Sequence, residues 1–377
     1  MVAGRAVAAA VVALVVVATG VAVSRVLRTP VTVVSANTVR SLAVVPAMDS
    51  ADTTRRWLER GVALEVERAL RGVVGLRVVS ATATTRVPRR RLMELLNVGS
   101  MLETRVSTGP MLKIQATLRG ENDSALTHRE YATTPNDLID AEDALARDVA
   151  NTLRAQVGLP AIARPQGSGT RSRPAHEYAM RALVLQSRGD TPSLRAAATL
   201  LDSAVRLDSS YGEAWAVRAT IADVSGDYDR AAVDARRAIA LDTTSAEPHV
   251  VLGDVEWSKR KATEAEREYR TAIRLDPQLT LARHRYAEML FELSRRGEAI
   301  REARRAHELD PLSGDLHAAY AQMLARAGRH VEADHEMAEL KRIRAILEPS
   351  TARPTVRKRT DHGKTTSRGR SRSSVRD

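Results

Sequence analysis

The chain contains no cysteine and very few aromatic residues. None of its 377 residues is cysteine, so disulfides, thiolate nucleophiles and cysteine-ligated zinc are excluded. Aromatic residues make up only 3% of the sequence, with a single phenylalanine, Phe291. Alanine, valine and leucine therefore have to fill the core, which suits closely packed helices with small residues at their contacts.

Catalytic motifs are also missing from the sequence. It contains no G-x-x-x-x-G-K-[ST], no G-x-S-x-G and no H-E-x-x-H. His330 and His335 flank Glu332 and Asp334, but a spacing of five residues does not align two side chains on one helix face. We interpret this stretch as a surface cluster rather than a metal site. The sequence predicts a protein that is not an enzyme and has neither cofactor nor metal.

The positive charge is concentrated at one end of the chain. The formal net charge is +12, and residues 351–377 alone carry nine Lys or Arg against two acidic residues. The remainder is only mildly basic, so the total does not argue for a nucleic-acid partner. Residues 351–377 have almost no apolar side chains and are predicted to be a disordered basic tail. The tail is either a solvated segment or a ligand for an acidic surface, lipid headgroups or nucleic acid.

An uncharged apolar run lies near the amino terminus. Residues 6–24 carry no charge between Arg5 and Arg25, and a helix of this length spans about 30 Å, enough for a bilayer core. We predict a transmembrane anchor within residues 1–30; a cleaved signal peptide and a buried core helix are the alternatives. Because the flanking charges nearly balance, they do not decide the orientation.

Four similar hexapeptides divide the carboxy-terminal half. They read AVRLDS, AIALDT, AIRLDP and AHELDP, and each leucine follows the previous one by 34 residues. The leucines are Leu207, Leu241, Leu275 and Leu309. A fixed period of this length is the signature of a repeat architecture in which neighbouring units stack to bury a shared core. The pattern predicts five units of two helices each over residues 175–350.

These units resemble tetratricopeptide repeats. Pro277 and Pro311 occupy the proline position between repeats, whereas Thr243 replaces it one unit earlier. Small residues stand where the helices of that repeat approach closely, as at Gly253, Ala287 and Ala321. The resemblance implies a solenoid with a concave surface that holds a protein or peptide partner.

Residues 41–159 have the pattern of a small α/β domain, and the Pro- and Gly-containing residues 160–174 that of a linker. Strands are expected at 41–47, 76–82, 100–107, 111–120 and 128–134, and helices at 52–75, 89–99 (ended by Gly99) and 135–158.

The phrases SLAVVP, GLRVVS and DLIDAEDALARDVANTLRAQVGL resemble the TolB-like or FlgO-like domain that precedes tetratricopeptide repeats in bacterial membrane-anchored sensors. GSMLETRV, at residues 99–106, departs from that family's pattern. The domain either spaces the repeats from the membrane or senses a ligand.

The resemblance also implies which side chains line the concave groove. In this sequence, the side chains at those positions are largely acidic and include two aromatic residues. The groove is therefore expected to prefer a basic or apolar segment, which includes the chain's own tail. The alternative is that these charged helix faces are simply solvated. The predicted residues are Glu213, Thr220, Asp223, Glu247, Asp254, Trp257, His284, Glu288, Phe291, Glu292, Asp315 and Gln322.

The fold predicted from the sequence is an α-helical tetratricopeptide-repeat solenoid of about five repeats, preceded by a small α/β domain and an N-terminal transmembrane helix. The expected function is a membrane-anchored scaffold for protein–protein interaction in the bacterial envelope. Its soluble part is expected outside the cytoplasm, with a single pass through the inner membrane. The alternative is a sensory or regulatory input module that acts with a separate effector protein. A nucleic-acid partner is disfavoured, because few aromatic side chains are available for base stacking.

Overall fold

The computed structural model describes residues 41–347, apart from 48–52, 72, 74, 81–86, 108–110, 121–123, 135–136, 157–160 and 162–168. The predicted anchor (1–30) and basic tail (351–377) lie outside the described residues. Within the described part of the chain, no helix has both the length and the apolarity needed to cross a membrane.

A five-stranded mixed sheet forms the centre of the amino-terminal domain. Its strand order is β2-β1-β3-β4-β5, with β1 parallel to β2 and β3, and with β3, β4 and β5 antiparallel. The internal strand β1, which lies between β2 and β3, is buried along its whole length, as its apolar run requires. The strands are β1 (Ser41–Pro46), β2 (Arg77–Ser80), β3 (Ser100–Ser107), β4 (Leu112–Gly120) and β5 (Ala125–Thr133).

Helices cover both faces of this sheet. Alternate residues of β1 point to opposite faces: Leu42 packs in one core with α2 (Thr53–Arg71) and α4 (Leu138–Gln156), and Ala43 packs in another with α3 (Arg89–Leu96). The expected end of α3 at Gly99 was wrong. The helix ends at Leu96, and the capping residue Asn97 takes the left-handed conformation with φ 48° and donates its amide to the carbonyl of Glu94.

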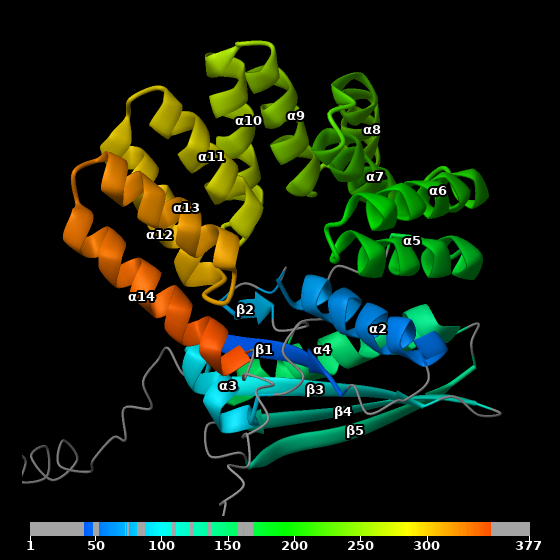
Figure 1. The fold of residues 1–377 in the computed structure, drawn as a ribbon. Coiled ribbons are helices and arrows are strands. Elements are labelled where there is room, and N and C mark those ends of the chain that lie inside the picture. The colour runs from blue at the N-terminus through cyan, green and yellow to red at the C-terminus, as the bar shows by residue number, and fades with distance from the viewer. Residues whose placement is uncertain are drawn as a thin grey trace, which may run out of the picture.

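Five helix pairs follow, and they confirm the predicted helical repeat (Figure 1). The first pair has the longer second helix: α6 has 17 residues, whereas α8 has 14. The pairs are α5 (Arg173–Gln186) with α6 (Thr191–Leu207), α7 (Gly212–Val224) with α8 (Tyr228–Leu241), α9 (Glu247–Ser258) with α10 (Ala262–Leu275), α11 (Thr280–Glu292) with α12 (Arg296–Leu309), and α13 (Gly314–Arg326) with α14 (His330–Leu347).

The recurring hexapeptide has a physical reason in this structure. Ala272 is fully buried, where a larger side chain would keep the helices apart. Asp276 then ends α10, and its Oδ1 accepts a hydrogen bond of 2.8 Å from the amide of Gln278 in the turn to α11. Close approach also explains Gly253, because a Cβ there would lie 2.6 Å from Cε1 of Tyr269.

The first end of the solenoid is fastened to the sheet domain by a mostly buried contact, here called the near contact. It joins Gly61 and Glu142, on α2 and α4, to His176 and Met180 on α5. Met180 lies in the same apolar core as the sheet and fills the space above Gly61, where a Cβ would come within 2.3 Å of its sulfur. Nε2 of His176 lies 2.9 Å from Oε2 of Glu142, and both side chains are buried.

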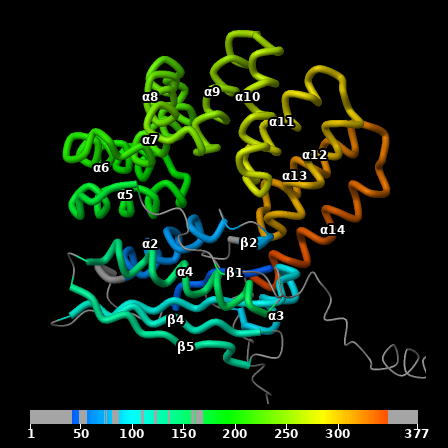
Figure 2. The backbone as a smooth tube through the Cα atoms, turned by 180° about the vertical axis from the view of Figure 1, so that it is seen from behind, coloured from blue at the N-terminus to red at the C-terminus, as the bar shows by residue number. Residues whose placement is uncertain are grey.

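The other end of the solenoid returns to the same domain through a second contact, the far contact. The Gln278 side chain donates to the carbonyl of Leu76 at 2.6 Å and accepts from the amide of Val78 at 3.0 Å, which satisfies the edge of β2. Arg77 donates to the carbonyl of Glu308 at 3.2 Å. The solenoid and the sheet domain therefore form a hoop, which the two opposite views of Figures 1 and 2 both show.

Candidate functional site

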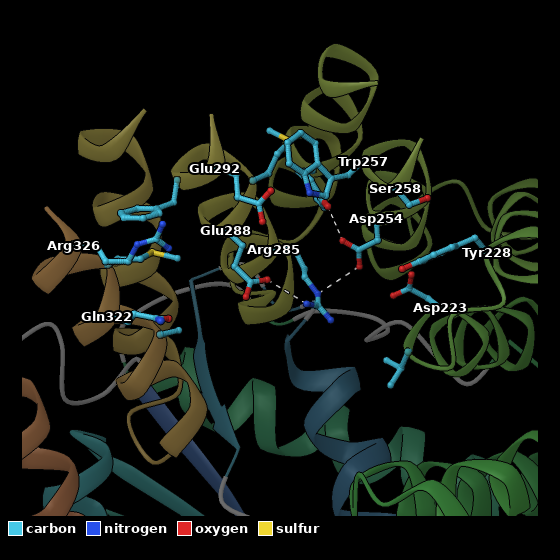
Figure 3. A pocket seen from close by; sticks show the side chains of 16 residues that line it. Asp223, Tyr228, Asp254, Trp257, Ser258, Arg285, Glu288, Glu292, Gln322 and Arg326 are labelled. Atoms are coloured by element: carbon cyan, nitrogen blue, oxygen red, sulfur yellow. Dashed lines mark hydrogen bonds and ion pairs between the residues drawn. The ribbon is translucent and has the colours of Figure 1, made fainter. Parts of the chain in front are cut away.

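A pocket of about 550 Å³ lies on the concave side of the solenoid. Most of its lining comes from the first helices of the second to fifth pairs, α7, α9, α11 and α13, because these are the helices that face the inside of the curve (Figure 3). We call it the groove pocket. It is lined by Asp223, Val224, Tyr228, Asp254, Trp257, Ser258, Tyr269, Arg285, Glu288, Met289, Phe291, Glu292, Ala319, Gln322, Met323 and Arg326.

One wall of the groove pocket is a network of carboxyl groups. The carboxyls of Asp223 and Asp254 both line the pocket; Asp223 is buried, and the side chain of Asp254 is only 14% exposed. Oδ1 of Asp254 accepts a hydrogen bond of 2.6 Å from the hydroxyl of Tyr269. Arg285 lies between Asp254 and Glu288, with its nitrogens 3.5 Å and 3.2 Å from their carboxylate oxygens. Arg285 thus contacts two of the three carboxyl groups on this wall, those of Asp254 and Glu288.

The environment holds a proton in this network. Burial raises the pKa of Asp223 to about 8, and the neighbouring carboxyl of Asp254 acts in the same direction. Burial also raises the pKa of Asp254, although Arg285 and the hydroxyl of Tyr269 act in the opposite direction. Near neutral pH the pair therefore carries less than its full negative charge. A cation placed beside it would displace the proton.

The opposite wall is aromatic and aliphatic. Phe291 stands beneath the guanidinium of Arg326, whose Cζ lies 4.7 Å from the ring centroid. Trp257 and the thioethers of Met289 and Met323 complete this wall. The groove pocket thus offers acidic groups beside adaptable apolar surface.

Seven of the twelve predicted groove residues line the groove pocket: Asp223, Asp254, Trp257, Glu288, Phe291, Glu292 and Gln322. Asp254, Glu288 and Gln322 are 34 residues apart, as are Asp223, Trp257 and Phe291. Two rows of repeat positions therefore meet in one place.

The other five predicted residues are placed elsewhere. Glu213 pairs with Arg68 of α2, so it lies at the junction with the sheet domain. The hydroxyl of Thr220 donates to the carbonyl of Ala216 at 3.2 Å, within its own helix. Glu247 and Asp315 lie in the first turns of α9 and α13, and Nε2 of His284 lies 3.5 Å from the carboxylate of Glu288.

The sequence reasoning missed the basic side chains of the groove pocket. Arg285 is the most important of them, since it neutralises part of the acidic wall. A signal was present in the period: the positions 34 residues apart from Arg285 are Val217, Val251 and Ala319. When one unit has a charged residue where the equivalent positions of the other units are small and apolar, that residue indicates a local function of the groove.

The chain matches no protein-family model and no curated protein. Solved structures of tetratricopeptide-repeat proteins do match. The thermophilic protein TTC0263 of Thermus thermophilus is 18% identical with a TM-score of 0.40, and the match covers 46% of this chain and 97% of that one. PilF of Pseudomonas aeruginosa is 18% identical with a TM-score of 0.38, covering 45% and 76% of the two chains.

YrrB, described as a tetratricopeptide-repeat protein with an unusual peptide-binding site, is 22% identical with a TM-score of 0.31, covering 44% of this chain and 84% of that one. At these identities and TM-scores, the three matches establish neither a family nor a function. The described residues form a helical solenoid of the tetratricopeptide-repeat type joined to a small sheet domain, as the 34-residue period and the five helix pairs show.

Proposed function

We propose that this protein is a non-enzymatic scaffold that holds a basic segment of a partner protein in the groove pocket. The observation that carries the proposal is the acidic wall of the groove pocket, where Asp223, Asp254 and Glu288 have only Arg285, among the described Lys and Arg side chains, as a contacting cation. A lysine or arginine at this place gains the attraction of two carboxylates, and its apolar neighbours pack on Trp257 and Phe291.

The shape of the molecule supports an extended segment as the ligand. The concave side of the solenoid faces the sheet domain across the hoop (Figure 1). A peptide strand or a single helix fits such a surface better than a folded domain does. Binding a short segment to a preformed concave surface also costs little rearrangement of the scaffold.

Peptide titrations on the full-length chain in detergent micelles test this proposal. Short labelled peptides with Lys and Leu should bind, and matched peptides with Glu in place of Lys should not. Affinity for the basic peptide should rise with pH through the Asp223 pKa of about 8, because the groove then loses its proton. It should fall as salt is added, because the attraction is screened.

Two variants separate the groove pocket from charge in general. Asp223→Asn should weaken basic-peptide binding and remove its rise with pH. Asp229→Asn removes an exposed carboxylate in the first turn of α8, outside the groove pocket, and should leave both unchanged. Equal losses in the two variants, or equal binding of the acidic peptide, would contradict the proposal.

The basic tail is a candidate occupant of the same site. Residues 351–377 carry nine Lys or Arg, the chemistry that the acidic wall selects, and the tail is continuous with the chain that ends the solenoid. Deleting 351–377 should increase affinity for an added basic peptide if the tail competes for the groove pocket. An unchanged affinity would remove the tail from the proposal.

The membrane position belongs to the proposal as well. We infer that residues 6–24 anchor the chain in the inner membrane, with the solenoid on the extracytoplasmic side. The support is their length without charge. A topology reporter fused after Asp377 tests this placement: activity of a periplasm-specific reporter supports it, and activity of a cytoplasm-specific reporter overturns it.

A regulatory input module is the second candidate, and the near contact favours it. Met180 of the first repeat lies in the core of the sheet domain, so a change in that domain reaches the solenoid directly. Hydrogen exchange of the full-length chain with candidate ligands tests this hypothesis. Protection that changes in both α2 and α5 would support it, and protection confined to the sheet domain would oppose it.

A further inference from the structure

Three helices bring two imidazoles and one carboxylate together at the last repeat. His307 of α12, His317 of α13 and Glu336 of α14 each offer one ligand atom, and these atoms all lie within 4.8 Å of one another. Nε2 of His307 is 3.4 Å from Oε1 of Glu336, and Nδ1 of His317 contacts the same oxygen. The ring centroids of the two histidines are 4.2 Å apart. No function discussed so far uses this cluster.

The hydrogen bonds of His317 leave one nitrogen available for a cation. Its Nε2 donates to the carbonyl of Pro311 at 2.9 Å, since a carbonyl can only accept. Nδ1 therefore faces the carboxylate of Glu336 with a lone pair unless a proton or a metal ion lies between them. A backbone carbonyl that accepts the other ring N–H is the usual support of a metal-ligating histidine.

His307 completes the arrangement. Its Nε2 points to the carboxylate oxygen that His317 also contacts, so all three groups converge on one point. Its Nδ1 is buried with no hydrogen-bond partner among the described residues. The side chains of His307 and Glu336 are 19% and 12% exposed, whereas His317 is almost fully covered. An ion from solvent can therefore reach the cluster from the side of His307 and Glu336.

The repeats provide an internal comparison. His249 pairs with Glu268 at 2.8 Å in the third unit, and Arg283 pairs with Glu302 at 2.7 Å in the fourth. These pairs occupy the repeat positions of His317 and Glu336. The position of His307, however, is Ile239 and Ile273 in the preceding units. A pair of a basic side chain and a glutamate across the two helices of a unit is thus a structural feature of the solenoid. Among these three units, only the last has a histidine from the preceding helix beside that pair.

We propose that His307, His317 and Glu336 bind a divalent transition-metal ion of the Zn²⁺ class. Two imidazoles and one carboxylate are a ligand set that zinc accepts, with the fourth position left to water. A tetrahedral site needs ligand atoms about 3.3 Å apart, and the His307–Glu336 separation already matches this. The closer His317–Glu336 pair opens to the same separation when an ion replaces the proton between them.

Such an ion would tie the end of the solenoid together. It joins α12, α13 and α14, the last helices that the structure describes. Glu308, next to His307, contributes its carbonyl to the far contact. Metal binding at this cluster therefore stabilises the terminal repeat and the side of the solenoid that rests on the sheet domain.

The test uses the untagged full-length chain after treatment with a chelator. Calorimetric titration with Zn²⁺ should give one ion per chain, with release of protons, because His317 loses the proton it shares with Glu336. Co²⁺ should give the intense visible absorption of a four-coordinate site. The melting temperature should rise with Zn²⁺.

Variants taken from the other repeats keep the fold and remove one ligand. His307→Ile installs the isoleucine of the preceding units, and His317→Arg installs the arginine that pairs with a glutamate in the fourth unit. Each should lower Zn²⁺ affinity more than about 100-fold, beyond the loss expected from an outer-shell partner. Each should also abolish the zinc-dependent rise in melting temperature.

His249→Arg is the matched control, because His249 belongs to a histidine–glutamate pair without a third ligand. It should bind Zn²⁺ as the parent chain does. A double variant, His330→Gln with His335→Gln, controls for surface histidines. Absence of saturable binding, or equal affinity in His307→Ile and the parent, would overturn the proposal. Loss of binding only in the double variant would overturn it as well.

Discussion

The near and far contacts attach the same solenoid to the same domain in different ways. At the near contact, a buried methionine fills the space over Gly61, and a buried histidine–glutamate pair lies beside it. At the far contact, one glutamine satisfies a strand edge, one arginine reaches a carbonyl, and the partly buried Leu312 packs against the core on the α3 side of the sheet. Buried apolar packing costs far more to separate than a few partly exposed hydrogen bonds. We therefore expect the first end to cost more free energy to separate than the second.

The largest expected effect comes from breaking the buried pair of the near contact. Glu142→Ala removes the carboxylate partner of the buried His176 and leaves it only the 3.4 Å contact of Nδ1 with the hydroxyl of Tyr211, so it should lower the free energy of unfolding by about 3 kcal/mol. Denaturant titration measures it. Asp140→Ala on the same helix is the control, because its pair with Arg171 is exposed and should contribute under about 1 kcal/mol. Similar losses in both variants would contradict the distinction between buried and exposed pairs.

Gly61→Ala tests the packing part of the near contact. The new methyl group would overlap the buried side chain of Met180 and should cost about 1–3 kcal/mol, although alanine favours a helix over glycine. The double variant with Met180→Ala should be less destabilised than the sum of the single variants, because the methyl then has room. Additive losses would show that the two side chains do not share this space.

Gln278→Ala probes the far contact and should have a smaller effect. It removes two hydrogen bonds to β2 and should cost about 1–2 kcal/mol locally. Hydrogen exchange at the amide of Val78 should accelerate, while α2 and α5 keep their protection. Gln322→Ala, in the groove pocket, is the matched glutamine control and should leave Val78 unchanged. A loss of protection at α5 would mean that the two contacts open together.

Between the two contacts, a substitution in the groove pocket is expected to change how the free energy of unfolding depends on pH. The pKa of Asp223 is about 8, above its unfolded value, so the folded state keeps a proton that the unfolded state releases. Stability therefore declines as pH rises from the unfolded pKa of about 4 to about 8, and it levels off above that. Asp223→Asn should make this decline shallower, because the amide has no proton to release. An unchanged pH profile of unfolding would contradict the assigned proton.

The elements of this molecule were predictable where the chemistry is local. The 34-residue spacing of Leu207 and its equivalents predicts the helix pairs, and the apolar run of β1 predicts a buried strand. The end of α3 was missed because Asn97, like glycine, accepts the left-handed conformation. When several neighbouring residues can adopt the left-handed conformation, tertiary packing decides which of them ends the helix.

Neither the hoop nor the proposed metal-ligand cluster could be predicted from local sequence patterns. Gln278 meets β2 across some 200 residues of chain, and no local pattern marks such a contact. His307, His317 and Glu336 come from three helices, so no short motif contains them. The groove residues were partly predictable because repeat positions carry over from unit to unit. Arg285 was missed because it departs from its own row.

The closed circuit of solenoid and sheet domain has a kinetic consequence. If a segment binds in the groove pocket as proposed, the solenoid and the sheet domain surround it while the far contact is closed, so it would have to enter and leave by its free end. A partner with folded domains on both sides of that segment would have to wait for the far contact to open. Its residence time would then follow the opening rate at Gln278 rather than the strength of the groove.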